Sequence, residues 1–185
     1  MRVTVRLAVL SAAVTAWGAA CSSGVHVSSN GPLDASGDPS TQCVPQPTSQ
    51  PLTFGLNTAT NTSKADVRIR EVKLVKPVAI EVLEARVFLL SSTASGPAEL
   101  VGMWPTYPPN AAQLAASEIV WSSVHVANNF VIHPGATANL VLELSRTRDG
   151  TAGTASATEI HYSSEGRNYE TTTNTAIRLA PSASC

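Results

Sequence analysis

Charged residues are scarce in this sequence. Asp, Glu, Lys and Arg make up 14% of the 185 residues, and the formal net charge is −1. Such a small and balanced charge provides no basic surface, so we expect no nucleic-acid partner. Methionine is rarer still, because Met103 is the only one after Met1. A soft copper site built from Met and His is therefore not expected.

Long apolar runs are also missing. The run Leu7–Ala16 is too short to span a bilayer stably, and it follows the positive charges of Arg2 and Arg6. A positive start, an apolar run and the small residues up to Ala20 are the parts of a secretory signal peptide, which we place at residues 1–20.

The segment Trp17-Gly18-Ala19-Ala20 before Cys21 resembles the lipobox of bacterial lipoproteins. It departs from that motif at Gly18, where Leu is usual. The resemblance implies that Cys21 becomes the mature N-terminus and carries a diacylglycerol with further fatty acyl chains such as palmitate. Two or more chains would hold the protein on the outer face of the cell membrane. The alternative is an ordinary secretory peptide cut after Ala20 that leaves a free thiol.

Residues 21–50 are rich in Ser, Pro, Gly and Asp. This composition buries too little apolar surface to offset the cost of ordering, so we predict a disordered tether. The domain proper is expected at 51–180, with a short tail at 181–185.

Cysteine is present in an odd number, three. If Cys21 is lipidated, Cys43 and Cys185 form an even pair in an oxidising compartment. We predict a disulfide bond between them that closes the ends of the domain, and the alternative is two free thiols.

The last third of the chain carries the clearest strand signals. Leu140, Leu142 and Leu144 alternate within Ala138–Leu144, which predicts a strand with these three side chains in the core. Asn139 and Glu143 are then expected in solvent. Farther on, a hairpin is predicted with arms at 158–163 and 168–179, because Gly166 can supply the positive φ of a tight turn.

The earlier part of the domain predicts further short strands. A parity change between Val67, Ile69 and Val72, Leu74 predicts a β-bulge near Arg70-Glu71. The expected elements are a strand at 52–56, a polar turn at 57–63, a strand at 66–75, a strand at 78–90 (with a helix at 80–88 as the alternative), a short helix capped by Asn110 that runs to Ser117, and strands at 119–121 and 124–132.

About seven short strands with almost no helix predict an all-β fold, an antiparallel two-sheet immunoglobulin-like sandwich. Two stretches strengthen this prediction: the one around Val67–Val75, and Pro134–Leu144 with Ile160–Tyr169 after it. They resemble the opening and closing strands of immunoglobulin-like or fibronectin-III-like domains in actinobacterial envelope lipoproteins. That resemblance implies a fold and a location and no activity.

Catalytic and metal-binding motifs are not found. Gly-x-Ser-x-Gly, Ser-x-x-Lys and His-Glu-x-x-His are missing, so we expect no enzymatic activity. Glu159 and Glu170, on the two arms of the hairpin, are interpreted as solvated charges. His125, His133 and His161 show no metal-ligand spacing, so no metal and no cofactor are predicted.

The best candidates for binding are the aromatic side chains Trp104, Tyr107 and Trp121, which could stack on a sugar or hold a partner's apolar group. The alternative is that they cover an open end of the core. The expected function is thus a lipid-anchored envelope module that binds another envelope protein or a glycan, or serves as a spacer. The alternatives are an enzyme acting on cell-wall polymer and a carrier of a metal or small ligand.

Overall fold

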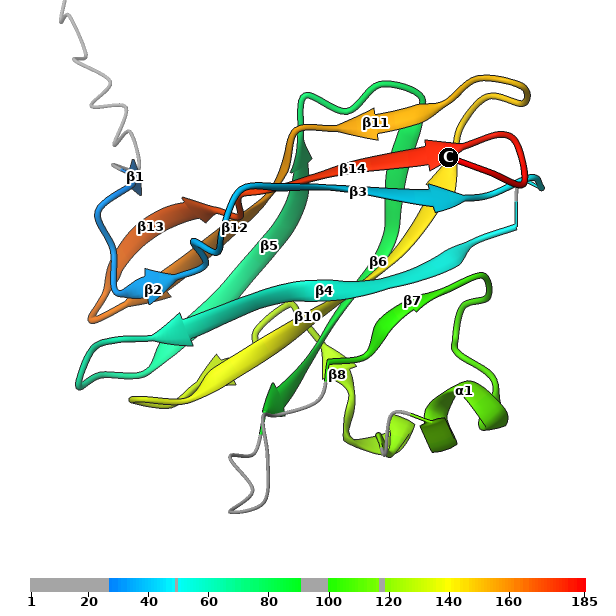
Figure 1. The fold of residues 1–185 in the computed structure, drawn as a ribbon. Helices are drawn as coiled ribbons and strands as arrows, with labels where there is room; N and C mark the ends of the chain where they lie inside the picture. The colour runs from blue at the N-terminus through cyan, green and yellow to red at the C-terminus, as the bar shows by residue number, and fades with distance from the viewer. Residues whose placement is uncertain (1–26, 49, 91–99, 117–118) are drawn as a thin grey trace, which may run out of the picture.

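The computed structural model describes residues 27–48, 50–90, 100–116 and 119–185, and most of them form β-strands (Figure 1). The all-β prediction is confirmed. The strands are β1 Val27–Ser28, β2 Leu33–Asp34, β3 Ser40–Pro45, β4 Leu52–Asn61, β5 Val67–Val75, β6 Ile80–Leu90, β7 Gly102–Trp104, β8 His125–Val126, β9 Val131–Ile132, β10 Thr137–Arg146, β11 Gly153–Ala155, β12 Ala157–Ser164, β13 Arg167–Thr172 and β14 Thr175–Ala180. A short helix, α1 (Ala111–Ala116), and a 3₁₀ turn at Trp121–Ser123 lie between β7 and β8.

These strands form three sheets instead of the two predicted from the sequence. The largest has six strands, β2-β4-β10-β6-β8 with β7 also paired to β4. The second has five strands in the order β1-β13-β12-β5-β9, and the third has three in the order β11-β14-β3. Most pairs are antiparallel, but β1 with β13 and β3 with β14 are parallel.

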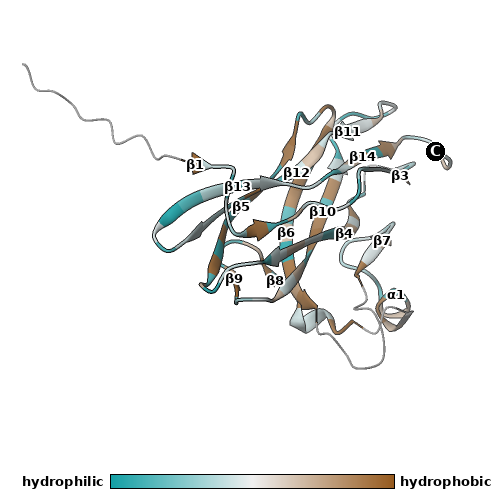
Figure 2. Ribbon diagram, turned by 60° about the vertical axis from the view of Figure 1, so that its left-hand side comes forward, coloured by the Kyte–Doolittle hydropathy of each residue, from teal (hydrophilic) through white to brown (hydrophobic). Residues whose placement is uncertain are grey.

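The six-stranded sheet packs one face against both of the other sheets. At one end Leu140 of β10 meets Ile160 of β12 in a cluster that the five-stranded sheet covers. At the other end Leu142 and Leu144 meet Leu179 of β14 in a cluster that the three-stranded sheet covers. The apolar side chains of β10 in these two clusters therefore lie between the layers, and Figure 2 shows how hydrophobic and hydrophilic residues are distributed along the strands.

Strand β10 lies at the centre, and both of its faces are covered. Leu140, Leu142 and Leu144 have no exposed surface, as predicted. Val141 and Asn139, on the other face, are also fully buried, and Glu143 is half-buried. The prediction that Asn139 and Glu143 lie in solvent is therefore wrong, because residues 100–116 and 119–124 cover this second face.

The predicted hairpin and bulge are both confirmed. Strands β12 and β13 pair around a turn in which Glu165 and Gly166 have φ of 50° and 74°. Across β12 on its other side, Glu71 of β5 pairs with His161 and Ile69 pairs with Tyr162, so Arg70 is the extra residue. The second arm of the hairpin is not continuous, because the chain leaves the five-stranded sheet after β13 and enters the three-stranded sheet as β14.

Three local predictions are wrong or only partly right. The strand expected at 124–132 is divided into β8 and β9. The expected turn at 57–63 is mostly strand, because Asn57 and Asn61 are buried and hydrogen-bonded inside β4. Residues 119–121 form no strand, and Trp121 opens a 3₁₀ turn. The strand at 78–90 is confirmed as β6, and the helix after Asn110 is confirmed as α1, with the Asn110 side chain accepting from the backbone N–H of Gln113 at 3.0 Å.

The segment predicted as a disordered tether is part of the domain from Val27 onward. Strand β3 pairs with β14 along its whole length, and Leu33 and Val44 are buried. Gly31 permits this packing, because a Cβ there would lie 2.0 Å from the hydroxyl of Tyr162. These strands could not be predicted from the composition of the segment, because most of its side chains are polar and few are apolar.

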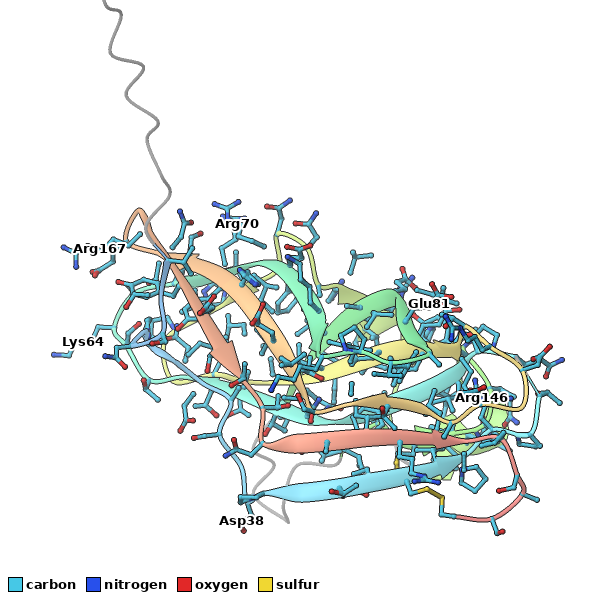
Figure 3. All side chains as sticks on the ribbon, turned by 90° about the horizontal axis from the view of Figure 1, so that it is seen from above. Asp38, Lys64, Arg70, Glu81, Arg146 and Arg167 are labelled. Carbon is cyan, nitrogen blue, oxygen red and sulfur yellow. A yellow bond between two sulfur atoms is a disulfide. The ribbon has the colours of Figure 1, made fainter. Side chains whose placement is uncertain are left out.

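The disulfide bond between Cys43 and Cys185 is present, as predicted, with a Cα–Cα distance of 6.0 Å (Figure 3). It joins β3 to the segment after β14. The predicted lipid attachment site, Cys21, and the signal peptide lie outside the described residues. Within the described ranges, none of the helical segments has the length and apolar character that crossing a bilayer requires.

Candidate functional site

Residues 100–116 and 119–124 form a cover on the outer face of the six-stranded sheet. Val101, Ile119 and Val124 are buried against Val141 of β10. The cover is fixed to the sheet by Asn139, whose Oδ1 accepts a hydrogen bond from the backbone N–H of Val101 at 2.9 Å. All three aromatic residues predicted to bind a ligand lie on this cover.

The cover brings Tyr107 and Trp121 together, and places Trp104 separately. The Tyr107 and Trp121 rings meet edge to face with their centroids 5.8 Å apart. Trp104 packs on the cluster around Val101 and donates its indole N–H to the Val101 carbonyl at 2.5 Å. All three side chains are half-buried. Trp104 thus fits the alternative of an aromatic that covers the core, whereas Tyr107 and Trp121 form a small aromatic surface.

Two charged residues of β6 hold this aromatic pair. The guanidinium of Arg86 makes two parallel hydrogen bonds to the Glu84 carboxylate, at 2.9 and 3.0 Å. The Tyr107 hydroxyl donates to the same carboxylate at 2.6 Å, and Arg86 lies 6.0 Å from the centre of the Trp121 ring. Bidentate and charge-assisted bonds of this kind fix side-chain geometry. We call Glu84, Arg86, Tyr107 and Trp121 the aromatic–ion surface.

Hydrogen bonding and burial at this surface shift the pKa values of two carboxyl groups, Glu84 and Glu143, in opposite directions. The hydrogen bonds from Arg86 and Tyr107 lower the pKa of Glu84. Glu143 lies directly opposite Glu84 across the β10–β6 ladder, and there burial and the charge of Glu84 raise the pKa of Glu143. Burial and the bond to Glu84 also raise the pKa of the Tyr107 hydroxyl well above its usual range, so this hydroxyl stays protonated and donates.

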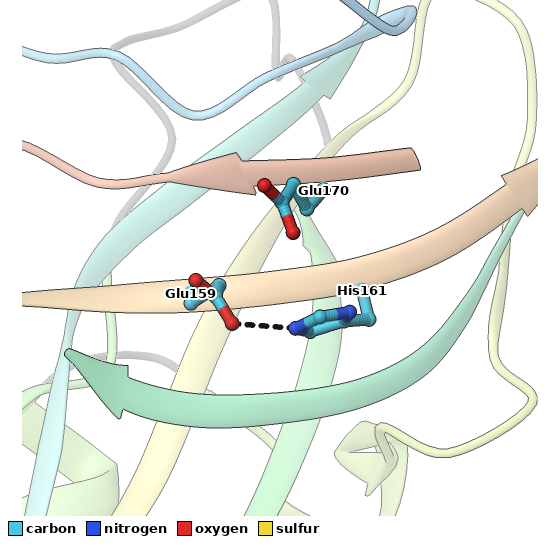
Figure 4. A group of neighbouring side chains, drawn as sticks. All are labelled: Glu159, His161 and Glu170. Carbon is cyan, nitrogen blue, oxygen red and sulfur yellow. Dashed lines mark hydrogen bonds and ion pairs between the residues drawn. The ribbon is translucent and has the colours of Figure 1, made fainter. Parts of the chain in front are cut away.

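A second cluster lies on the exposed face of the five-stranded sheet and joins Glu159, His161 and Glu170 (Figure 4). One ligand atom from each residue lies within 4.8 Å of the other two. Glu159 and His161 are two residues apart on β12, and Glu170 of β13 lies directly opposite His161. The sequence placed the two glutamates on the two arms of one hairpin, where they were interpreted as solvated charges. The missing signal was Glu-x-His on one arm together with the hairpin register, which brings Glu170 beside them.

Open grooves adjoin the histidines. A groove of about 490 Å³ lies beside the second cluster and is lined by His161, Arg70, Glu71 and Asn168, among others. His125 and His133 line a different groove of about 620 Å³. There His125 stacks on Phe130, and Nδ1 of His133 lies 2.9 Å from Asp66. Of the three histidines considered together in the sequence, His161 therefore lies apart from His125 and His133, which share one groove.

Comparison with known proteins identifies no family for this chain. No model of a protein family matches this chain, and no curated protein matches its sequence. Among solved structures, the chain is similar to the Vibrio cholerae VesB protease, with 10% sequence identity and a TM-score of 0.37. The match covers 80% of this chain and 32% of the protease chain, so this chain spans about a third of that protein's length.

This match to a protease contradicts the expectation that the chain has no enzymatic activity, and that expectation is not kept. A TM-score and an identity this low do not assign the protease fold or its activity to this chain either.

Proposed function

We propose that this protein is a lipid-anchored module on the outer face of the cell membrane that binds an envelope glycan through the aromatic–ion surface. The observation that carries the proposal is the network in which Glu84 holds both Arg86 and Tyr107 beside the half-buried Trp121. Aromatic rings stack on the apolar faces of sugars, and fixed charged groups hydrogen-bond their hydroxyls. A site whose side chains are already held in place loses less entropy on binding.

The location is supported by the covalent chemistry of the chain. A disulfide bond between Cys43 and Cys185 fits an oxidising compartment outside the cytoplasm. The order of a positive start, an apolar run and small residues before Cys21 supports export followed by lipidation.

The finer fold proposal is an immunoglobulin-like sandwich. It is supported by the way the five-stranded and three-stranded sheets lie side by side over one face of the six-stranded sheet, because β12 and β14 both supply side chains to clusters shared with β10. Two face-to-face layers of mainly antiparallel strands are the arrangement of a sandwich.

Anchoring is tested with Cys21→Ala. The variant should leave the membrane fraction or fail to be processed, because the thiol that accepts the lipid is gone. If Cys21→Ala protein is correctly cleaved and still sediments with membranes, the lipid attachment is refuted.

Glycan binding is tested by co-sedimentation of the purified protein with isolated cell-wall polysaccharide. Trp121→Ala and Tyr107→Phe should each weaken binding at least about tenfold, a loss of roughly 1.4 kcal/mol. Val120→Ala is the matched control, because Val120 adjoins Trp121 and is 65% exposed. Equal sedimentation of all variants would exclude this surface, and crosslinking in intact cells would then show whether a protein partner is bound instead.

A further inference from the structure

We propose that Glu159, His161 and Glu170 form a binding site for a divalent transition-metal ion, and that the ion is Zn²⁺. This site is on the opposite sheet from the aromatic–ion surface and does not depend on the glycan proposal. The starting observation is that one ligand atom from each of the three side chains lies within 4.8 Å of the other two.

The backbone holds these three residues in fixed relative positions. Glu159 and His161 project from the same face of β12 because they are two residues apart. The adjacent antiparallel pairing sets Glu170 opposite His161, and the residues on either side of His161, Ile160 and Tyr162, are buried in the core. A site on paired strands is more precise than one on loops.

The three ligands suit zinc better than other common ions. Zinc binds imidazole nitrogen and carboxylate oxygen at about 2.0–2.2 Å in tetrahedral geometry, so neighbouring ligand atoms lie about 3.5 Å apart. Rotation of flexible glutamate side chains brings atoms now within 4.8 Å to that separation. Two carboxylates also balance the charge of the ion. Ca²⁺ and Mg²⁺ prefer sites made of oxygen ligands alone, and no thiolate or thioether is in the cluster to select Cu(I).

The hydrogen bond now made within the cluster is compatible with metal binding. Nε2 of His161 lies 2.5 Å from Oε1 of Glu159 (Figure 4), so these two atoms need to separate by about 1 Å to reach the spacing of two ligands on one tetrahedral ion. Binding of the ion replaces this hydrogen bond, and the proton shared by the two atoms is released to solvent. The side chains are only partly exposed, at 26% for His161 and 29% for Glu159, which limits competition from water.

The neighbouring charges leave the cluster available. Lys73 of β5 lies opposite Glu159, but its ammonium group is 2.8 Å from Glu71 and forms an ion pair there. Three protein ligands leave the fourth zinc position open, as in sites where water or a substrate atom completes the coordination. The groove of about 490 Å³ that His161 lines gives access to this position.

The test is zinc binding by the full chain, purified without a histidine tag and treated with a chelator, in competition with a chromophoric zinc indicator. One equivalent of Zn²⁺ should bind and raise the melting temperature by mass action. His161→Gln and Glu170→Gln should each weaken binding at least tenfold, a change of about 1.4 kcal/mol. His133→Gln and His125→Gln are the matched controls and should bind as the original chain does.

Substitution with Co²⁺ checks the geometry, because tetrahedral coordination gives intense visible absorption that His161→Gln should abolish. The metal-free variants should melt at the same temperature as the metal-free original, which separates lost binding from lost folding. The proposal is overturned if no zinc binds, if the controls lose binding as much as His161→Gln, or if Cu²⁺ binds here and Zn²⁺ does not.

Discussion

Asn139 has no exposed surface, and its side-chain amide makes hydrogen bonds in two directions. Its Nδ2 donates to the carbonyls of Gly55 and Asn57 at 3.1 and 2.8 Å, beside the irregularity where β4 passes β10. Its Oδ1 accepts from the backbone N–H of Val101. One side chain thus provides hydrogen bonds to two backbone carbonyls of β4 and also fixes the cover that carries Tyr107.

We expect Asn139→Ala to lower the free energy of unfolding by about 3 kcal/mol, because buried donors and acceptors lose their partners. Asn128→Ala, at an exposed asparagine, is the control and should change stability by less than about 0.5 kcal/mol. Urea unfolding of both variants measures the difference. A loss at Asn139 no larger than that at Asn128 would contradict the role given to its amide.

Glu143 should make stability depend on pH. Burial and the charge of Glu84 raise its pKa in the folded state, so the fold favours the protonated acid and loses stability as pH rises through that pKa. Glu143→Gln should therefore melt higher than the original chain at about pH 7, and the two should converge below about pH 4.

Glu84 gives the opposite sign and serves as the comparison. Hydrogen bonds from Arg86 and Tyr107 lower its pKa, so the stability it contributes is present at neutral pH and is lost as pH falls through the folded-state pKa. Glu84→Gln should thus melt lower than the original chain near neutral pH, with a difference that shrinks in acid. If Glu143→Gln and Glu84→Gln changed the melting temperature in the same direction near neutral pH, this assignment would be contradicted.

At the scale of elements, β10 shows what the alternation of apolar and polar residues predicts about a strand and what it does not. The pattern of Leu140, Leu142 and Leu144 predicted a strand and its inward face, and both are confirmed. The burial of Val141 could not be predicted, because it depends on the cover formed by residues 100–116 and 119–124, which has no periodic pattern of its own. Alternation within the segment predicts the strand and one buried face. Whether the second face is buried depends on residues that are distant in the sequence.

The same limit applies to the two candidate sites. Trp104, Tyr107 and Trp121 could be found as rare aromatics, but the partners of Tyr107, which are Glu84 and Arg86, come from β6. The bulge at Arg70 was predictable, since a parity change within one strand is a local signal. The pairing of His161 with Glu170 needed only the hairpin register, and it was missed because no metal motif has that spacing.

Alanine substitutions along β10 test the burial of both faces. Leu140→Ala, Leu142→Ala and Leu144→Ala should each cost about 2–5 kcal/mol of unfolding free energy through lost burial and cavity formation. Val141→Ala should also cost at least about 1 kcal/mol, because its side chain is fully buried under the cover. Denaturant titrations give all four values, and a neutral Val141→Ala would mean that the cover does not pack on the sheet in solution.

At the scale of the whole molecule, the N-terminal strands and the disulfide bond act together. Strand β3 is the edge of the three-stranded sheet, held to β14 by parallel pairing, and Cys43 within it is bonded to Cys185. The bond closes a loop with a sequence separation of 142 residues, which reduces the conformational freedom of the unfolded chain.

Replacing both cysteines, in Cys43→Ser/Cys185→Ser, should lower the free energy of unfolding by up to about 4–5 kcal/mol at equilibrium. The secreted original protein should resist thiol alkylation until a reductant is added, and its unreduced peptides should show the two residues joined by mass spectrometry. A double variant with unchanged stability, or native protein that is alkylated without reductant, would contradict the bond.

The position of Cys43 also sets how this molecule would respond to mechanical tension. Under the proposed anchoring, a pull on the bound glycan loads the chain from the membrane side, and the load first reaches β1, β2 and the start of β3. These short pairings can peel away in sequence and release about 50 Å of chain between residues 27 and 42. Peeling then reaches a covalent ring, because everything from Cys43 to Cys185 is closed by the disulfide bond. Under tension, the segment before Cys43 would therefore extend first. The part of the chain between Cys43 and Cys185 could not extend to its full contour length, because the disulfide bond joins its two ends.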